Sequence, residues 1–366
     1  MSSAKRPPFP VDFNKAPFIV IWEATRACDL VCRHCRAQAQ PRPDPQQLST
    51  AEGKALLDHI RDEFGPVLMV ITGGDPLKRS DLDELIAHGH GRGLRMTIAP
   101  SATPLLTPER IAQLKAVGIQ RMALSLDGAD AATHDGFRRV DGTYERTMTA
   151  FACAHEMGLE TQMNTTLGRH NLDQLEAVAE IGRWHGISLW SVFQLVATGR
   201  ASADMMLSPV EQEKIFRRLA EIAESESWPF DVKTTAGQPF YRVRAQRLIK
   251  QQGAAGRDWK TQGLRSPRSV NDGKGICFIS HTGEVQPSGF LQIPLGNIRE
   301  RSLASIYRDD PVFRRLRDPD SFSGKCGECE YNDLCGGSRS RAWSLNDDAF
   351  SSDPTCLYQP KGRAVV

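Results

Sequence analysis

The segment from Trp22 to Gln38 constrains this chain most, because it places three cysteines directly after a predicted buried strand. That strand is Phe18–Ala24, which apart from Glu23 consists of β-branched, aromatic and other apolar residues. The cysteines, Cys28, Cys32 and Cys35, follow with the spacing CxxxCxxC. Three thiolates on one loop can bind three irons of a [4Fe–4S] cluster and leave the fourth iron open to a small molecule. Unrelated buried thiols or a zinc site are the alternatives, although zinc ligands usually come in CxxC pairs.

Composition limits the class of protein to which this chain can belong. It has 366 residues, a formal net charge of +2 and nine cysteines. This length suits one large domain or two unequal ones, and the small net charge calls for neither nucleic acid nor a membrane surface. The sequence contains no long apolar run and no signal-peptide core, so we expect a cytoplasmic protein. In that compartment the cysteines are expected to bind metal rather than to form disulfides.

Between Pro17 and about Ser225, short apolar runs alternate with amphipathic stretches, which is the pattern of βα units. Crossovers of this length join parallel strands, and eight such units would close a TIM barrel. Six units therefore predict an α/β fold, an incomplete (β/α)6 TIM-like barrel. The predicted strands are residues 18–24, 67–71, 95–99, 121–126, 160–166 and 189–196, and the helices that follow them lie near residues 50–64, 82–92, 108–117, 143–157, 172–185 and 209–225.

Three other segments flank this predicted barrel of residues 17–225. Residues 1–16 are expected to form a flexible arm, and residues 276–366 a small cysteine-rich domain that metal would staple. Residues 226–275 are predicted to be a basic linker or exposed helix, or else a surface that meets an anionic substrate. The basic residues of that segment are Arg242, Arg244, Arg247, Lys250, Arg257, Lys260, Arg265 and Arg268.

Polar residues and glycines follow several of the predicted strands. The carboxyl ends of parallel strands meet at one edge of a barrel, so we expect these residues to surround one ligand. The glycine pair lets the backbone approach that ligand closely, although a Gly-Gly-Asp run is also a common turn. The ligand contacts predicted in this way are Gly73, Gly74, Ser125, Asp127 and the backbone near Gln194.

A second set of thiols lies near the C-terminus, with the spacing CxxCx5Cx20C. Four ligands can saturate a metal centre, and by spacing alone this set could form a zinc ribbon. Its members are Cys326, Cys329, Cys335 and Cys356. Of the remaining residues with metal-binding side chains, Cys153 is predicted to be a core thiol in a helix, and His134 and His281 are predicted to have surface or packing roles.

The CxxxCxxC loop after a strand resembles the cluster-binding signature of the radical SAM superfamily. The resemblance implies that the open iron binds the amino and carboxylate groups of S-adenosylmethionine (SAM), with His34 standing where relatives carry an aromatic residue. It also implies that the Gly-Gly-Asp run contacts the SAM amino group, where relatives have a glutamate in place of the shorter Asp75. Ser125 and Asp127 resemble the ribose-contacting SxDG of the family. Asn164 matches a position that contacts SAM, whereas Arg138 matches a family arginine but would equally suit the surface.

Beside the first motif, the C-terminal thiols resemble a SPASM-type iron–sulfur domain. Relatives with two auxiliary clusters have cysteines where this chain has Ser288 and Arg339. The resemblance therefore implies one auxiliary [4Fe–4S] cluster, with Cys277 left as an orphan thiol. A second cluster completed by serine, His281 or the substrate is the alternative.

The resemblance also implies an activity. A reduced cluster at Cys28, Cys32 and Cys35 would cleave SAM to a 5′-deoxyadenosyl radical that abstracts hydrogen from a substrate. A peptide or a haem-type tetrapyrrole is the expected substrate, oxidative decarboxylation or crosslinking the expected outcome, and ferredoxin or flavodoxin the expected reductant. A non-catalytic electron-transfer adaptor and a zinc-stapled structural protein remain as alternatives.

Overall fold

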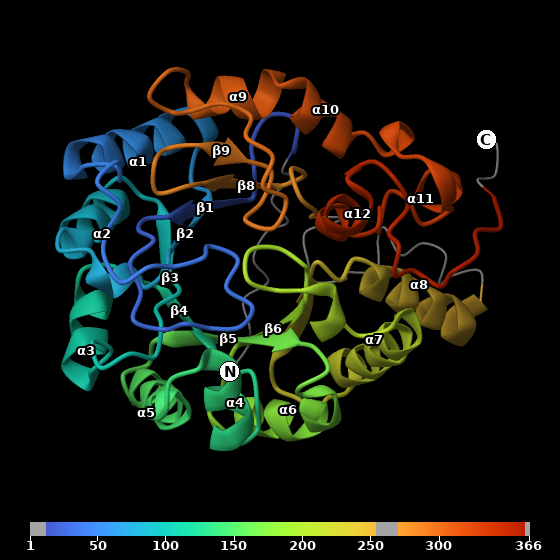
Figure 1. Ribbon diagram of the computed structural model, residues 1–366, viewed down its shortest axis with the longest axis horizontal. Helices are drawn as coiled ribbons and strands as arrows, with labels where there is room; N and C mark the ends of the chain where they lie inside the picture. Colours follow the sequence, from blue (N-terminus) through green and yellow to red (C-terminus); the bar gives the residue numbers. More distant parts are fainter. Residues whose placement is uncertain (1–11, 254–269, 363–366) are drawn as a thin grey trace.

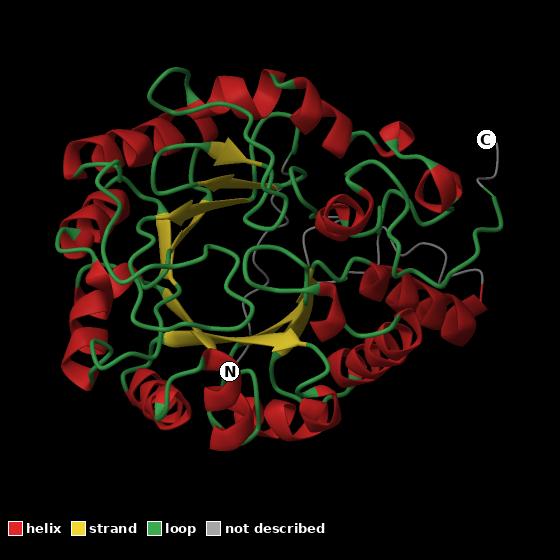
Figure 2. Ribbon diagram, viewed as in Figure 1, coloured by secondary structure: helices red, strands yellow, loops and turns green. Residues whose placement is uncertain are grey.

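The structure, a computed structural model, describes residues 12–253 and 270–362. These residues form a curved sheet of nine strands in the order β7-β6-β5-β4-β3-β2-β1-β8-β9. Neighbouring strands from β7 through β8 pair in parallel, and only β9 is antiparallel to its neighbour. Figures 1 and 2 show the strands as an arc with the helices along its outer side. The predicted class, an incomplete α/β barrel, is confirmed.

Each of the first six strands is followed by a helix, as the sequence pattern predicts. These elements are β1 (Ile19–Glu23), α1 (Thr50–Phe64), β2 (Leu68–Thr72), the short 3-10 helix η1 (Pro76–Lys78), α2 (Leu82–Gly91), β3 (Arg95–Ile98), α3 (Pro108–Ala116), β4 (Arg121–Ser125), α4 (Ala131–Arg138), α5 (Thr143–Glu156), β5 (Glu160–Leu167), η2 (Leu172–Gln174), α6 (Leu175–Trp184), β6 (Leu189–Gln194), η3 (Ala203–Met205) and α7 (Pro209–Glu224).

Local chemistry explains where these helices begin and end. At the start of α1, Ser49 and Glu52 form a capping box, in which each side chain accepts a hydrogen bond from the other residue's backbone N–H. Gly118, Gly158 and Gly186 follow α3, α5 and α6 with φ angles of 115°, 63° and 62°. Glycine adopts such positive φ angles without steric cost, so each of these helices can turn directly into the next strand.

A seventh βα unit lies where the sequence pattern indicates a linker. It consists of β7 (Asp231–Thr235), which pairs with β6, and α8 (Pro239–Gln252). Two basic residues of α8 form ion pairs with α7, at 2.5 Å between Arg242 and Glu213 and 3.0 Å between Arg247 and Glu224. These two arginines therefore hold α8 on α7 and do not form a free anion-binding surface. Arg257, Lys260, Arg265 and Arg268 lie outside the described residues.

The C-terminal part continues the barrel sheet. Strand β8 pairs in parallel with β1, and Cys277 lies in register with Val20. Cys277 is fully buried in the core, and burial raises the pKa of its thiol far above the usual range. The elements of this part are β8 (Ile276–Ile279), β9 (Val285–Gln286), α9 (Leu303–Asp309), α10 (Pro311–Arg317), η5 (Pro319–Ser321), α11 (Gly324–Glu328) and α12 (Arg339–Asn346).

The start of the described chain packs against this C-terminal part. The Tyr307 hydroxyl donates a hydrogen bond of 2.8 Å to the Phe13 carbonyl, and the Arg308 side chain donates to the Lys15 carbonyl at 2.7 Å. Residues 1–11 of the predicted arm lie outside the described residues. No helix in the described ranges combines the length and apolar character needed to span a bilayer.

Candidate active site

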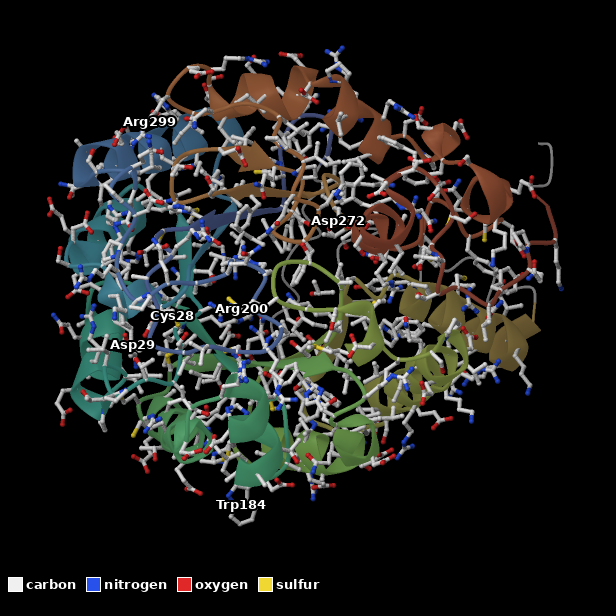
Figure 3. The ribbon with its side chains drawn as sticks, in the orientation of Figure 1. Cys28, Asp29, Trp184, Arg200, Asp272 and Arg299 are labelled. Atoms are coloured by element: carbon white, nitrogen blue, oxygen red, sulfur yellow. The ribbon has the colours of Figure 1, made fainter. Side chains whose placement is uncertain are left out.

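The three N-terminal cysteines lie on a loop after β1, residues 24–40, that we call the cysteine loop. Figure 1 shows this loop crossing the open centre of the arc, and Figure 3 labels Cys28 on this loop and Arg200 on the loop after β6. Cys28 and Cys32 are buried, and Cys35 is half-buried. The backbone N–H of Leu30 donates to the Cys28 sulfur at 3.3 Å, and that of Ala39 donates to the Cys35 sulfur at 3.4 Å. Such donors stabilise thiolates that bind a metal cluster.

The glycine pair after β2 lets that strand approach the backbone of the cysteine loop. The Gly74 N–H donates to the Thr25 carbonyl at 2.7 Å. A Cβ on Gly74 would stand 2.5 Å from the Ala27 carbonyl oxygen, and one on Gly73 would stand 2.4 Å from that of Thr25. This close backbone contact is sufficient to require glycine at both positions. It does not depend on a ligand that their carbonyl groups could also contact.

The Asp75 side chain forms hydrogen bonds with other groups of the protein. Its carboxylate is buried and accepts hydrogen bonds from the Thr103 hydroxyl at 2.8 Å and from the backbone N–H groups of Leu77 and Ser101 at 3.1 and 3.3 Å. Burial raises the pKa of this carboxyl group. The predicted side-chain contact with SAM remains a prediction, and the geometry favours the backbone of this segment over the carboxylate.

The loop after β6 closes over the other side of the cysteine loop. The Arg200 N–H donates to the Cys35 carbonyl at 3.1 Å, and its guanidinium donates to the Ala39 carbonyl. A Cβ on Gly199 would stand 2.4 Å from the Cys35 carbonyl oxygen. The Gln194 side chain, in contrast, packs against Gly237 on the helix-facing side of the sheet. Only its backbone remains a predicted ligand contact.

A buried ion pair connects β4 with the cysteine loop. Arg138 lies 2.5 Å from the Asp127 carboxylate, and its guanidinium donates to the Cys32 sulfur at 3.8 Å. The Thr166 N–H donates to Asp127 at 2.7 Å. Burial raises the pKa of Asp127, but Arg138, with smaller contributions from His34, His134 and the Thr166 N–H, lowers it overall to about 2. Of the two roles that the sequence allows for Arg138, the structure excludes the exposed one.

Three aromatic rings stack beside this ion pair. His34 of the cysteine loop stacks on Phe137 at 4.3 Å between ring centroids, and Phe137 stacks on His170 at 3.7 Å. Burial lowers the pKa of His34 to about 3, so its ring is neutral near neutral pH. Sequence reasoning identified His34 alone, because Phe137 and His170 meet it only through the fold.

Several polar residues of β4 to β7 lie on the inner face of the barrel. Met96 and Met163 face outwards against Gly89 and Gly182 of the covering helices, so their strand neighbours face inwards. The inward set includes Ser125 and Asn164, which are register partners on β4 and β5, together with Gln162, Ser191 and Lys233. Ser125 and Asn164, predicted from separate motifs, thus lie side by side.

A buried charged network joins the cysteine loop to the C-terminal part. Glu23 at the end of β1 accepts from Arg36 at 2.8 Å and lies 3.0 Å from the His281 ring. The other ring nitrogen of His281 lies 3.4 Å from Asp44. Burial raises the pKa of Glu23, but Arg36 and His281 lower it below its usual value. The predicted packing role of His281 did not include these two carboxylates.

The four C-terminal thiols lie together beside α11 and α12. Cys326 and Cys335 are buried, and Cys329 and Cys356 are half-buried. Burial, with smaller contributions from Glu330, Cys326 and Cys356, raises the pKa of Cys329 to about 11. The Gly337 N–H donates to the Cys335 sulfur at 3.4 Å. The C-terminal cysteines therefore provide four sulfur ligands for a metal centre, and at least one of these sulfurs already accepts a backbone hydrogen bond.

The two positions at which relatives carry further cysteines are filled by other contacts. The Ser288 hydroxyl donates to Asp272 at 2.5 Å, and Asp272, which lies beside α12 in Figure 3, also accepts from the Ser340 N–H at 2.8 Å. Arg339 is fully buried. With Cys277 in the core of the sheet, these contacts favour one auxiliary cluster.

Both thiol sets fit iron–sulfur clusters by their donor chemistry. In the described ranges, no three Cys, His, Asp or Glu side chains are arranged to hold a single metal ion. In a [4Fe–4S] cluster each thiolate binds a different iron, so the ligands need not converge on one point. Burial raises the pKa of Cys28 to about 11, which means that its ionisation would accompany metal binding.

Comparison with known proteins identifies the family. Residues 22–181 match the radical SAM superfamily, and residues 271–330 match SPASM, an iron–sulfur cluster-binding domain. The AdoMet-dependent heme synthase of Nitratidesulfovibrio vulgaris is 39% identical over 351 residues, which cover 94% of this chain and 93% of that protein. The chain belongs to the radical SAM superfamily. It is a radical SAM enzyme with a SPASM domain.

Other relatives carry names that describe different activities. The Fe-coproporphyrin III synthase of Methanosarcina barkeri is 29% identical, covering 94% of this chain and 88% of that protein. The mycofactocin maturase MftC of Mycolicibacterium smegmatis is 26% identical, covering 93% and 83%. A solved structure of Streptococcus suis SuiB bound to S-adenosylmethionine superposes with a TM-score of 0.72 at 17% identity, covering 94% and 78%. At that identity the likeness to SuiB concerns the fold.

Proposed function

We propose that this radical SAM enzyme acts on an iron porphyrin and oxidatively decarboxylates propionate side chains, as a step in haem formation. The 39% identity to an AdoMet-dependent heme synthase over nearly the whole of both chains carries the proposal. The inner face of the barrel supports it, because Lys233, in register with Ser191, offers a cation to a carboxylate.

In this proposal, the cluster at the cysteine loop, when bound and reduced by ferredoxin or flavodoxin, would supply the electron that cleaves SAM to methionine and a 5′-deoxyadenosyl radical. A propionate would give one hydrogen atom from a methylene carbon to that radical and then lose CO2 and one electron, leaving a vinyl group. The auxiliary cluster at the C-terminal thiols would accept the electron. The chain's residues would hold SAM through the backbone of Gly73 and Gly74, and the loops after β1 and β6 would exclude water.

The test is an anaerobic reaction of reconstituted enzyme with dithionite, SAM and Fe-coproporphyrin III. We expect 5′-deoxyadenosine, CO2 and a porphyrin that is lighter by one CO2 and two hydrogen atoms for each propionate converted. A Cys28→Ala variant should form none of these, and Cys153→Ser, which changes a thiol outside both sets, should match the wild type. Formation of 5′-deoxyadenosine from SAM with an unchanged porphyrin would contradict the proposed substrate.

Modification of a peptide is the second candidate function, favoured by the relationship to the mycofactocin maturase MftC. The same assay separates the two candidates. A peptide substrate would leave Fe-coproporphyrin III unchanged, and the porphyrin would not stimulate SAM cleavage above the rate of the enzyme alone.

A further inference from the structure

Arg339 is a buried cation without a carboxylate partner. It begins α12, has no exposed surface and forms no ion pair with a carboxylate within the described residues. Its guanidinium donates to the backbone carbonyls of Gly337 at 3.3 Å, Ala349 at 3.0 Å and Ser351 at 2.7 Å, and it lies 4.5 Å from the centre of the Phe322 ring. These neutral groups satisfy its hydrogen bonds but leave its charge uncompensated.

The remaining partner of Arg339 is a thiol of the C-terminal set. Its Nη2 donates to the Cys326 sulfur at 3.3 Å, and the Asp353 N–H donates to the same sulfur at 3.3 Å. Burying an unpaired charge costs several kcal/mol, so a negative partner is expected. Arg341, which is equally buried, has such a partner in Asp353 at 2.7 Å. For Arg339 the only candidate in contact among the described residues is Cys326, and a metal-bound thiolate carries the required charge.

We propose that Arg339 is a positioning residue that raises the reduction potential of an auxiliary iron–sulfur cluster through its hydrogen bond to Cys326. The reduced cluster carries one more negative charge than the oxidised cluster. A buried cation against one of its ligands therefore stabilises the reduced form. In the proposed reaction, a higher potential favours uptake of the electron that the substrate releases with CO2. The inference rests on the auxiliary cluster of the proposed function, and its test separates the two.

Arg242 is the other arginine near this set, close to Cys335 and Cys356. Its charge is already paired with Glu213 at 2.5 Å, and no hydrogen bond joins it to a sulfur in the described ranges. We therefore assign the larger effect on the potential to Arg339.

The experiment is an anaerobic redox titration followed by EPR, on full-length protein in which Cys28, Cys32 and Cys35 are replaced by alanine. Only the auxiliary cluster then contributes to the signal. Arg339→Gln keeps much of the side-chain volume and removes the charge, and Arg339→Lys keeps the charge. Arg317→Gln is the matched control, because Arg317 is also buried, lies 4.8 Å from the centre of the Tyr307 ring and donates to the carbonyls of Tyr307 and Arg308, with no contact to sulfur.

We expect Arg339→Gln to disfavour reduction by at least about tenfold, which for one electron is a shift of about 59 mV to more negative potential. Arg339→Lys should shift it less, and Arg317→Gln should leave it unchanged. An unchanged potential in Arg339→Gln would overturn the inference. Loss of the cluster from both Arg339 variants, with normal loading of Arg317→Gln, would also overturn it, since Arg339 would then serve assembly. Zinc in place of iron in the parent protein would instead contradict the auxiliary cluster itself.

Discussion

The cysteine loop is held in place by backbone contacts that only glycine permits. Gly73 and Gly74 allow the segment after β2 to contact the cysteine loop, and Gly199 allows the loop after β6 to do so. At each of these positions, a Cβ would collide with a backbone carbonyl oxygen of the cysteine loop. At Gly199 the backbone also adopts a φ angle of 63°, which disfavours other residues. The positions of the three thiols thus depend on residues that do not bind the cluster.

Replacement of Gly74 by alanine tests this dependence. A Cβ there would stand 2.5 Å from a backbone carbonyl oxygen, so we expect Gly74→Ala to displace the cysteine loop and reduce the iron bound there. Iron and sulfide content after anaerobic reconstitution is the measurement. Gly136→Ala is the control, because a Cβ at Gly136 in α4 meets no atom within 4 Å. Equal iron content in the two variants would contradict this view of Gly74.

The contribution of the ion pair between Asp127 and Arg138 to stability can be tested by substitution. Arg138→Met leaves the buried Asp127 carboxylate without its cation, and we expect a loss of about 3 kcal/mol in the free energy of unfolding. Denaturant unfolding of the anaerobic protein measures this loss. Because the cost comes from the unpaired charge, adding Asp127→Asn should recover part of it. If the double variant loses more free energy of unfolding than the two single variants lose together, the two residues do not stabilise each other as an ion pair.

At the scale of elements, β7 and α8 show where sequence patterns fail. The strand reads DVKTT and has only one strongly apolar residue, Val232, because the residues on its inner face are polar. Its outer face packs against α7. The basic residues of α8 suggest an exposed surface until Glu213 and Glu224 of α7 are placed beside them. Charge that looks free in the sequence is paired between neighbouring helices.

Lys233 of β7 gives this element a measurable pH dependence. Burial, and to a lesser degree Arg121, lower its pKa from 10.5 to about 8. The folded state therefore binds the proton less tightly than the unfolded state, and this group destabilises the fold below about pH 8, with stability recovered as pH rises towards the unfolded pKa. We expect Lys233→Met to raise the melting temperature near pH 7, with a smaller gain near pH 10. A gain that does not change with pH would argue against a charged, buried Lys233.

At the scale of the whole molecule, the SPASM part and the barrel share one sheet. Strand β8 pairs with β1, and the network of Glu23, Arg36 and His281 joins the cysteine loop to the residues after β8. This continuity fixes Cys277 in the core, away from the four thiols beside α12. The pairing of β8 with β1 thus connects the cysteine loop with the chain that leads to the C-terminal thiols.

Iron content tests this arrangement. With one cluster at each thiol set, the reconstituted protein should bind about eight irons. Cys277→Val should leave that number unchanged, because the residue only packs in the core. Cys335→Ala should remove about half of the iron, and the EPR signal that responds to SAM should remain. About twelve irons in the wild type would show that a second auxiliary cluster exists.

The sequence by itself determined the class of fold, the two thiol sets and the helix boundaries at Ser49, Gly118, Gly158 and Gly186. These features are local, since thiol spacing, apolar periodicity and capping residues act within a few positions along the chain. The tertiary structure alone decided that Arg138 and Arg339 contact cysteine sulfurs, that the Asp75 carboxylate accepts hydrogen bonds from other protein groups, and that β8 extends the barrel sheet. Each of these depends on pairing between distant segments, and in the desolvated interior such pairing decides whether a charge is stabilised or left exposed to a ligand.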